Sequence, residues 1–81
     1  MRTLSNSSSA QRRQSIDVLV QHYVSWREEC YAVADAYQRW DRCARGQREA
    51  GYAAYVAALD REEHAAGVYA EQIEHVKRIP V

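Results

Sequence analysis

The apolar residues of this chain form two stripes that mirror each other about Gly46. The first stripe reads Ile16, Leu19, Tyr23, Trp26, Cys30, Val33, Tyr37, Trp40, and the second reads Tyr52, Tyr55, Leu59, Glu62, Ala66, Tyr69, Ile73, Val76. Within each stripe the steps alternate between three and four residues, which is the spacing of the a and d positions of a coiled coil. Each residue of the first stripe has a counterpart at the same distance from the turn in the second stripe. The sequence therefore predicts an all-α fold, an antiparallel two-helix hairpin with coiled-coil-like packing.

The predicted bounds of the two helices follow from residues that start and stop helices. The segment Ser8-Ser9-Ala10-Gln11 fits the Ser-x-x-Gln capping box, so we expect a flexible, Ser-rich tail at residues 1–8 and one helical domain at residues 9–79. The first helix is predicted at about residues 9–45 and the second at about residues 47–78, before Pro80. Gly46 lies between them, where it can adopt the left-handed conformation that ends a helix.

A single continuous helix that dimerises is the main alternative architecture. If Ile16 occupies an a position, unbroken heptads place Gly51 at an a position, yet the second stripe begins at Tyr52. A hairpin explains this slip, whereas a continuous helix carries it as a packing defect. Gly46 and Gly51 would each also cost a continuous helix about 1 kcal/mol relative to Ala. The phase of the stripes therefore favours the hairpin.

Size and charge exclude several classes of protein. The 81 residues are enough for one domain, and 11 basic and 11 acidic residues give no net charge, which argues against a dedicated nucleic-acid binder or a polybasic membrane anchor. No apolar run approaches the roughly 20 residues that span a bilayer, and the first residues lack the apolar core of a signal peptide. Cys30 and Cys43 lie too far apart on one helix to form a disulfide. These features predict a cytoplasmic protein with free thiols.

A lone hairpin buries only a thin seam, so we expect a partner that covers more apolar surface. One flank of the seam carries the predicted partner interface: Val20, Val24, Tyr31, Ala34, Val56, Ala70. The other flank carries small residues that would let a further helix approach closely: Ala36, Gly51, Ala58, Ala65. The simplest partner is a second copy, which would give a homodimeric four-helix bundle, and another helical protein is the alternative.

Glu62 is the one charged residue at a seam position, and it is predicted to face Cys30. We interpret Cys30 and Glu62 as a polar layer that fixes the register, with the carboxylate reaching toward Arg27 or Arg61. A small metal or ligand carrier with Cys30 and Glu62 in a bundle core is an alternative function. The pairs Asp60/His64 and Glu71/His75 have the spacing of helical metal ligands, but they are expected on the solvated surface.

Four arginines gather near the predicted turn: Arg39, Arg42, Arg45, Arg48. They could contact phosphate, so association with nucleic acid through the hairpin tip is a second alternative function. Alternatively, these arginines only offset the dipole at the end of the helix, a role for which no ligand is needed. Cys43 lies nearby, and the sequence leaves open whether its thiol is reactive or inert.

The segment Ala54-Tyr55-Val56-Ala57-Ala58-Leu59-Asp60-Arg61-Glu62-Glu63-His64-Ala65-Ala66, preceded by Tyr31-x5-Tyr37-x2-Trp40, resembles small helical proteins of actinobacteria. This resemblance implies no particular activity. No motif for catalysis, metal binding or nucleotide binding is recognised, so no catalytic residue, metal or cofactor is predicted. We therefore expect a non-enzymatic helical interaction module, an adaptor, regulator or small structural protein that acts through helix–helix contacts.

Overall fold

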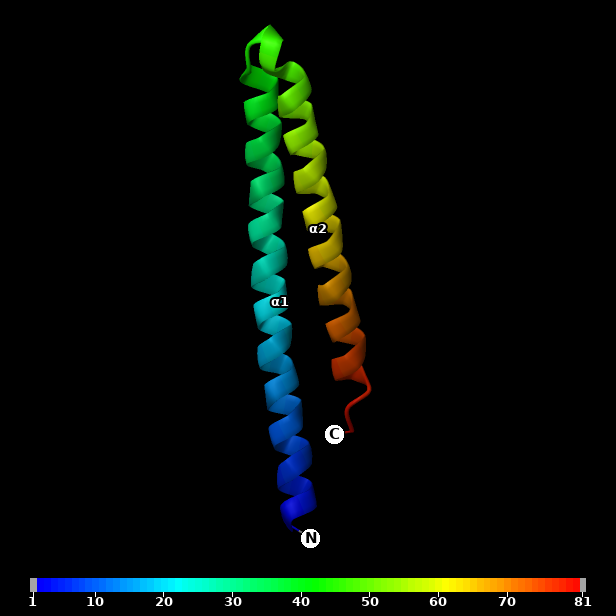
Figure 1. Cartoon of the computed structure of the whole chain (residues 1–81). Coiled ribbons are helices and arrows are strands. Elements are labelled where there is room, and N and C mark those ends of the chain that lie inside the picture. Colours follow the sequence, from blue (N-terminus) through cyan, green and yellow to red (C-terminus); the bar gives the residue numbers. More distant parts are fainter. Residues whose placement is uncertain (1, 81) are drawn as a thin grey trace.

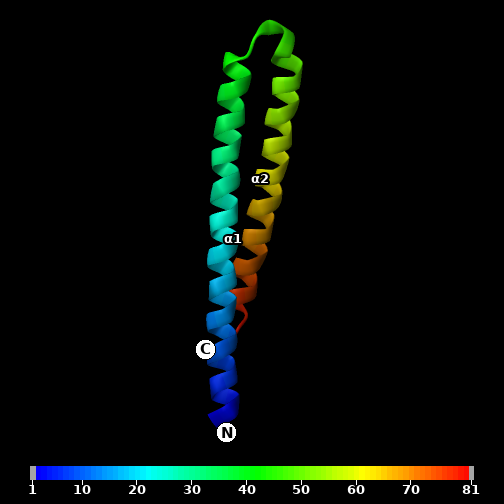
Figure 2. The ribbon, with the colours of Figure 1, turned by 60° about the vertical axis from the view of Figure 1, so that its left-hand side comes forward.

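The computed structural model describes the backbone of residues 2–80 and the side chains of residues 9–80. It consists of helix α1 (Arg2–Arg42), a short 3₁₀ turn η1 (Arg45–Gln47) and helix α2 (Arg48–Lys77). The two long helices run side by side in opposite directions and are joined at one end by η1 (Figures 1 and 2). The radius of gyration is 18.9 Å, whereas a compact domain of this length has about 12 Å. The predicted all-α hairpin is confirmed, and it is a narrow rod of 68 × 14 × 12 Å.

The bounds of the helices differ from the predicted ones at the start of the chain. Helix α1 begins at Arg2, so residues 2–8 have helical backbone and Ser8 is not the N-cap. No Gly or Pro precedes Gly46 in the sequence, and extending an existing helix gains a hydrogen bond for each residue, whereas only its nucleation is costly. The first turns of α1 therefore extend past the end of α2 (Figure 1).

The turn contains Gly46, but not in the left-handed conformation that was predicted. Helix α1 ends at Arg42, and Ala44 then reverses the chain with an extended backbone at φ −65° and ψ 153°. The amide of Gln47 donates a hydrogen bond of 2.8 Å to the Ala44 carbonyl, which closes η1. No glycine has a positive φ among the described residues, so the left-handed Gly46 was a wrong prediction. The reversal needs only an extended residue followed by a 3₁₀ turn, which most residue types can adopt.

Aromatic contacts between the helices confirm the antiparallel register. The ring centroids of Tyr23 and Tyr69 are 5.6 Å apart, and those of Tyr37 and Tyr55 are also 5.6 Å apart. Near the turn, the rings of Trp40 and Tyr52 are separated by 5.1 Å. Each of these pairs joins residues that the mirrored stripes place opposite each other.

Both helices are nevertheless rotated about their axes relative to the prediction. Half of the predicted seam is retained, and all eight of its residues are at least half-buried: Leu19, Trp26, Val33, Trp40, Tyr55, Glu62, Tyr69, Val76. At the other eight seam positions, the residue that precedes the predicted one faces the partner helix instead. We call these residues the inner line: Ser15, His22, Glu29, Ala36, Gly51, Ala58, Ala65, Gln72. Ala58 is completely buried and Ser15 is 8% exposed, whereas the predicted Ile16 and Leu59 are 39% and 38% exposed. The helices thus meet along the line that carries the smaller residues.

Small side chains on this inner line explain the rotation, because they let the two backbones approach. A methyl group built on Gly51 would lie 3.3 Å from the Trp40 Cα and 3.4 Å from the Cys43 Sγ. Four small residues, Ala36, Gly51, Ala58 and Ala65, were expected to receive a further helix, but they lie on the line where α1 and α2 meet. Close approach on this side leaves the bulky tyrosines at the edge of the seam.

The open end of the hairpin is closed by residues from both helices. The Gln72 side chain donates a hydrogen bond of 3.0 Å from Nε2 to the Ser15 carbonyl. Beyond α2, Ile79 is 6% exposed, and its amide donates to the Val76 carbonyl. Arg12 occupies the next seam position toward the N-terminus, and its Nη1 is buried without a hydrogen-bond partner among the described residues.

Candidate interaction surface

Large apolar side chains are exposed on one long side of the hairpin, which we call the apolar face. It comprises Ile16, Val20, Tyr23, Cys30, Ala34, Tyr37 from α1 and Tyr52, Val56, Leu59, Ala66, Ala70, Ile73 from α2. In an antiparallel helix pair, residues that follow the inner line by one position lie on the same side of both helices. Ile16, Tyr23 and Tyr37 have this position in α1, and Tyr52, Leu59 and Ile73 have it in α2. The rotation of the helices therefore creates one continuous apolar surface.

Two aromatic clusters form the floor of the apolar face. The first joins Tyr23, Trp26 and Tyr69, with the Trp26 and Tyr69 rings stacked at 5.7 Å and 10°. In the second, near the turn, Trp40 stacks on Tyr55 at 5.5 Å and 16°, and further rings pack against them from Tyr37 and Tyr52. Stacked and edge-to-face rings add stabilisation beyond their buried area. They also hold the exposed tyrosines in fixed positions, so the face is preorganised.

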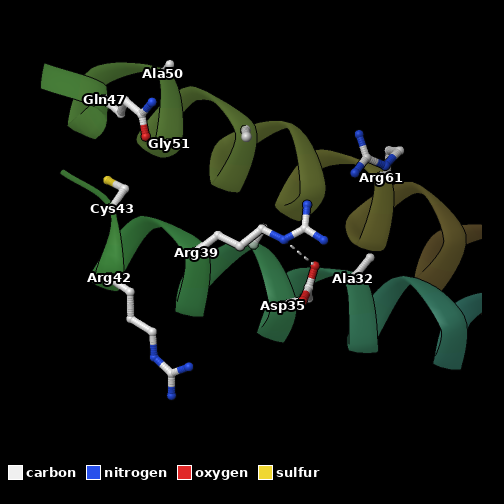
Figure 3. A pocket seen from close by; sticks show the side chains of 11 residues that line it. Ala32, Asp35, Arg39, Arg42, Cys43, Gln47, Ala50, Gly51 and Arg61 are labelled. Carbon is white, nitrogen blue, oxygen red and sulfur yellow. Dashed lines mark ion pairs between the residues drawn. The ribbon is translucent and has the colours of Figure 1, made fainter.

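The opposite side of the hairpin, which we call the polar side, carries charged residues together with small apolar ones. Near the turn it contains an open groove between the helices, lined by Ala32, Asp35, Ala36, Arg39, Arg42, Cys43, Gln47, Ala50, Gly51, Ala54, Arg61. Figure 3 shows Arg39 extending along α1 to Asp35, with which it forms an ion pair of 3.0 Å, whereas Arg42 points away from α2. None of the described large apolar side chains on this side is exposed. The two sides of the hairpin therefore differ in the size of their exposed apolar side chains, which are large on the apolar face and small on the polar side.

The structure divides the six residues that the sequence predicts as a partner interface. Val20 and Ala34 border the apolar face on α1, and Val56 and Ala70 border it on α2. Val24 and Tyr31 lie one position further round, on the outer side of α1, and Tyr31 is 67% exposed. The tyrosines at the centre of the apolar face were not predicted to be exposed, because the sequence analysis assigned them to the seam between the helices. The adjacent line of small residues was the signal that could have revealed the rotation.

Glu62 has a different partner from the ones expected. The indole Nε1 of Trp26 donates a hydrogen bond of 3.2 Å to Glu62 Oε2, across the seam. Arg61 instead pairs with Glu29, at 3.4 Å between Nε and Oε2. Cys30 is a half-buried free thiol on the same level. Glu62 therefore ties the two helices together through an indole, and the register role of Cys30 and Glu62 remains a prediction.

Arg27 packs on aromatic rings rather than on a carboxylate. Its guanidinium carbon lies 5.4 Å from the centre of the Tyr31 ring and 5.9 Å from the centre of the Trp26 ring. Hydrogen bonding with the Tyr31 side chain, followed by charge interaction with it, raises the pKa of the Arg27 guanidinium above its usual value. Arg27 therefore carries a full positive charge at the border of the apolar face.

Two of the four arginines near the turn are engaged within the hairpin. Arg39 pairs with Asp35, and Arg48 lies 5.3 Å from the centre of the Trp40 ring and donates a hydrogen bond to the Trp40 carbonyl. Arg42 and Arg45 are exposed. Contact of this tip with phosphate or nucleic acid remains a prediction.

The His-containing pairs lie on the exposed surface of α2. Asp60, His64 and Glu71 border a shallow hollow there. Among the described residues, no group of three or more His, Cys, Asp or Glu is arranged to hold a metal ion. A carrier function for Cys30 and Glu62 remains a prediction.

Comparison with known proteins found no matching family model, no matching curated protein and no matching solved structure. In the described part of the chain, neither helix is long and apolar enough to cross a bilayer.

Proposed function

We propose that this protein is a non-enzymatic helical interaction module and that its apolar face packs against other helices. The single observation that carries this proposal is that most of the exposed large apolar side chains gather on one side, namely Ile16, Val20, Tyr23, Tyr37, Tyr52 and Leu59. Contiguous exposed apolar side chains are typical of interaction sites on proteins. The aromatic clusters beneath the face favour binding, because a preorganised surface loses little side-chain entropy on association.

A second copy of the chain is the partner that we propose, giving a homodimeric four-helix bundle. A compact protein of 9.3 kDa exposes about 5,000 Å², whereas this hairpin exposes 6473 Å². The difference of about 1,500 Å² includes the first turns of α1 that extend past α2, and it exceeds the roughly 800 Å² that each partner buries in a standard interface. Two hairpins that stack through their apolar faces would enclose the tyrosines, Ile16 and Leu59 in a common core.

Sedimentation equilibrium over a wide range of protein concentration tests this proposal. We expect the wild-type chain to have twice its monomer mass. Val20→Glu and Val56→Glu place a charge at the two borders of the apolar face, and we expect both variants to dissociate while circular dichroism shows unchanged helix content.

Ala57→Glu is the matched control, because Ala57 is exposed on the polar side of α2. This variant should dimerise like the wild type. A wild-type chain that stays monomeric at every concentration would contradict the dimer, and dissociation by Ala57→Glu would contradict the assignment of the interface to the apolar face.

A further inference from the structure

Both borders of the apolar face have the same direction of charge along the rod. The heptad position of Val20 and Ala34 on α1, and that of Val56 and Ala70 on α2, extends to both ends of the hairpin. From the open end to the turn, it carries Arg13, Val20, Arg27, Ala34, Asp41 on α1 and Lys77, Ala70, Glu63, Val56, Glu49 on α2. Each border is therefore basic at the open end and acidic at the turn.

The charges at the ends of the borders are available to a partner. Arg13, Asp41 and Glu49 are exposed, and none of them belongs to the ion pairs formed among the described residues. Lys77 pairs only with Glu74, one turn away on the same helix, at 3.3 Å. Because the two borders have the same sign at each end of the rod, one hairpin cannot neutralise these charges by itself.

Resting on the proposed dimer, we infer how its two copies are arranged: they stack face to face with their turns at opposite ends. The two-fold axis then crosses the rod at right angles, near its middle. Each helix packs antiparallel against the same helix of the other copy. In this arrangement Arg13 of each copy meets Asp41 of the other, and Lys77 of each copy meets Glu49 of the other.

The charges along the borders favour this arrangement and its register. The ends contribute four ion pairs, which outweigh two like-charge contacts near the axis, between the two copies of Arg27 and between the two copies of Glu63. Sliding one copy along the other by a heptad places Arg27 opposite Val20 or Ala34 and separates the partners of all four end pairs. The borders are thus most complementary when the two rods overlap fully.

The other symmetric face-to-face arrangement has both turns at the same end. Each α1 then packs against α2 of the other copy, and the two-fold axis along the rod allows no sliding. Arg13 would meet Lys77 and Asp41 would meet Glu49, which gives four like-charge contacts against only two ion pairs, both at the middle of the rod. The charges therefore oppose this arrangement.

The sizes of the apolar side chains support the same conclusion independently. With the turns at opposite ends, six apolar pairs each join a larger with a smaller side chain: Tyr23–Cys30, Tyr37–Ile16, Tyr52–Ile73, Leu59–Ala66, Val20–Ala34, Val56–Ala70. With the turns at the same end, Tyr37 would meet Tyr52 and Ile16 would meet Ile73. Tyr37 and Tyr52 are 49% and 51% exposed, so four bulky tyrosines would then crowd one end of the bundle.

Charge reversal at the ends of the α1 border has effects of opposite sign in the two arrangements. Arg13→Glu creates a repulsion with Asp41 if the turns lie at opposite ends, but an attraction to Lys77 if they lie at the same end. We expect sedimentation equilibrium at low salt to show dimers about tenfold weaker for Arg13→Glu and for Asp41→Arg, since each variant turns two ion pairs into two repulsive contacts. The double variant regains both pairs and should dimerise like the wild type.

Arg42→Glu is the matched control, because it changes the net charge as Arg13→Glu does, at an exposed residue that points away from α2 (Figure 3). Its dimer should have the wild-type dissociation constant. Tighter or unchanged dimers of Arg13→Glu and Asp41→Arg, or an equal weakening in the control, would overturn the arrangement but leave the dimer intact. A monomeric wild type would overturn the dimer itself.

Methyl contacts between wild-type copies test the arrangement without a substitution. In a mixture of ¹³C-labelled and unlabelled chains, Val20 should give intermolecular NOEs to Ala34, and Val56 should give them to Ala70. Intermolecular NOEs from Val20 to Ala70 would instead place the turns at the same end and overturn the inference.

Discussion

The close approach of the two helices at Gly51 can be measured by comparing two glycines of the same helix. Gly51 and Gly67 both lie in α2, and Ala has a helix propensity about 1 kcal/mol more favourable than Gly. A methyl group at Gly67 would have no atom within 4 Å. We therefore expect Gly67→Ala to raise the free energy of unfolding by about 1 kcal/mol.

Gly51→Ala combines the same propensity gain with a steric cost. The new methyl group would lie 3.3 Å from the Cα and the Cδ1 of Trp40, and the Cα can move only if α1 moves with it. Overpacking of this kind costs about 1–3 kcal/mol. Gly51→Ala should therefore be neutral or destabilising, and it should be less stable than Gly67→Ala by about 1–3 kcal/mol.

Thermal unfolding followed by circular dichroism gives the comparison. For a domain of this size, 1 kcal/mol corresponds to a shift of about 4–8 °C in Tm. Both variants need the same protein concentration, because a dimer makes Tm depend on concentration. If Gly51→Ala stabilised the protein as much as Gly67→Ala, the helices would not meet along the line of small residues, and the origin of the apolar face would be refuted.

Three further substitutions test other parts of the fold. Gly46→Ala should leave the free energy of unfolding unchanged or raise it by up to about 1 kcal/mol, because Gly46 has no positive φ and no atom lies within 4 Å of an added methyl group. A marked loss of stability in urea unfolding would instead indicate that Gly46 adopts the left-handed conformation. Arg12→Met should raise the free energy of unfolding by about 1 kcal/mol, since it removes a buried Nη1 without a hydrogen-bond partner and keeps an apolar stem of similar length. A variant that unfolds at a lower urea concentration would show that the Arg12 guanidinium does form stabilising hydrogen bonds. Trp26→Phe should lower the free energy of unfolding by about 1 kcal/mol more than Trp40→Phe, because among the described residues only the Trp26 indole donates a hydrogen bond to a carboxylate. Equal losses of stability in both variants would show that the hydrogen bond to Glu62 does not stabilise the contact between the helices.

The hairpin and its register could be predicted because they depend on periodicity alone. The mirrored stripes bring Tyr23 opposite Tyr69, Tyr37 opposite Tyr55 and Trp40 opposite Tyr52, whichever way the helices turn about their axes. Hydrophobic spacing determines which residues lie near the seam, and the mirror symmetry determines the direction of the second helix.

The rotation of the helices could not be read from hydrophobicity. Tyr23 and Tyr37 score as core residues, but their volume keeps the backbones apart, whereas Ala58 and Gly51 allow close contact. Which line becomes the centre of the seam depends on this competition between volume and hydrophobicity. The apolar face was consequently predicted at its borders, by Val20 and Val56, and missed at its centre, and its role as a partner surface stays a prediction.

The hydrogen-bond partners and the ends of the helices could also not be predicted from the sequence. Glu62 accepts from the Trp26 indole, one turn of α1 away from the expected Cys30 level, because the rotation turns the large ring across the seam. Gly46 lies in the turn, within η1, but an extended Ala44 followed by the 3₁₀ turn reverses the chain without a left-handed glycine.

The proposed dimer requires that a second copy covers the apolar face. Isotope-filtered NOE spectroscopy on a mixture of ¹³C-labelled and unlabelled chains observes contacts between copies only. We expect intermolecular NOEs from the methyl groups of Leu59, Val20 and Ile73, and none from those of Ala54 and Ala57 on the polar side. Intermolecular NOEs confined to Ala54 and Ala57, or a complete lack of them at high protein concentration, would contradict it.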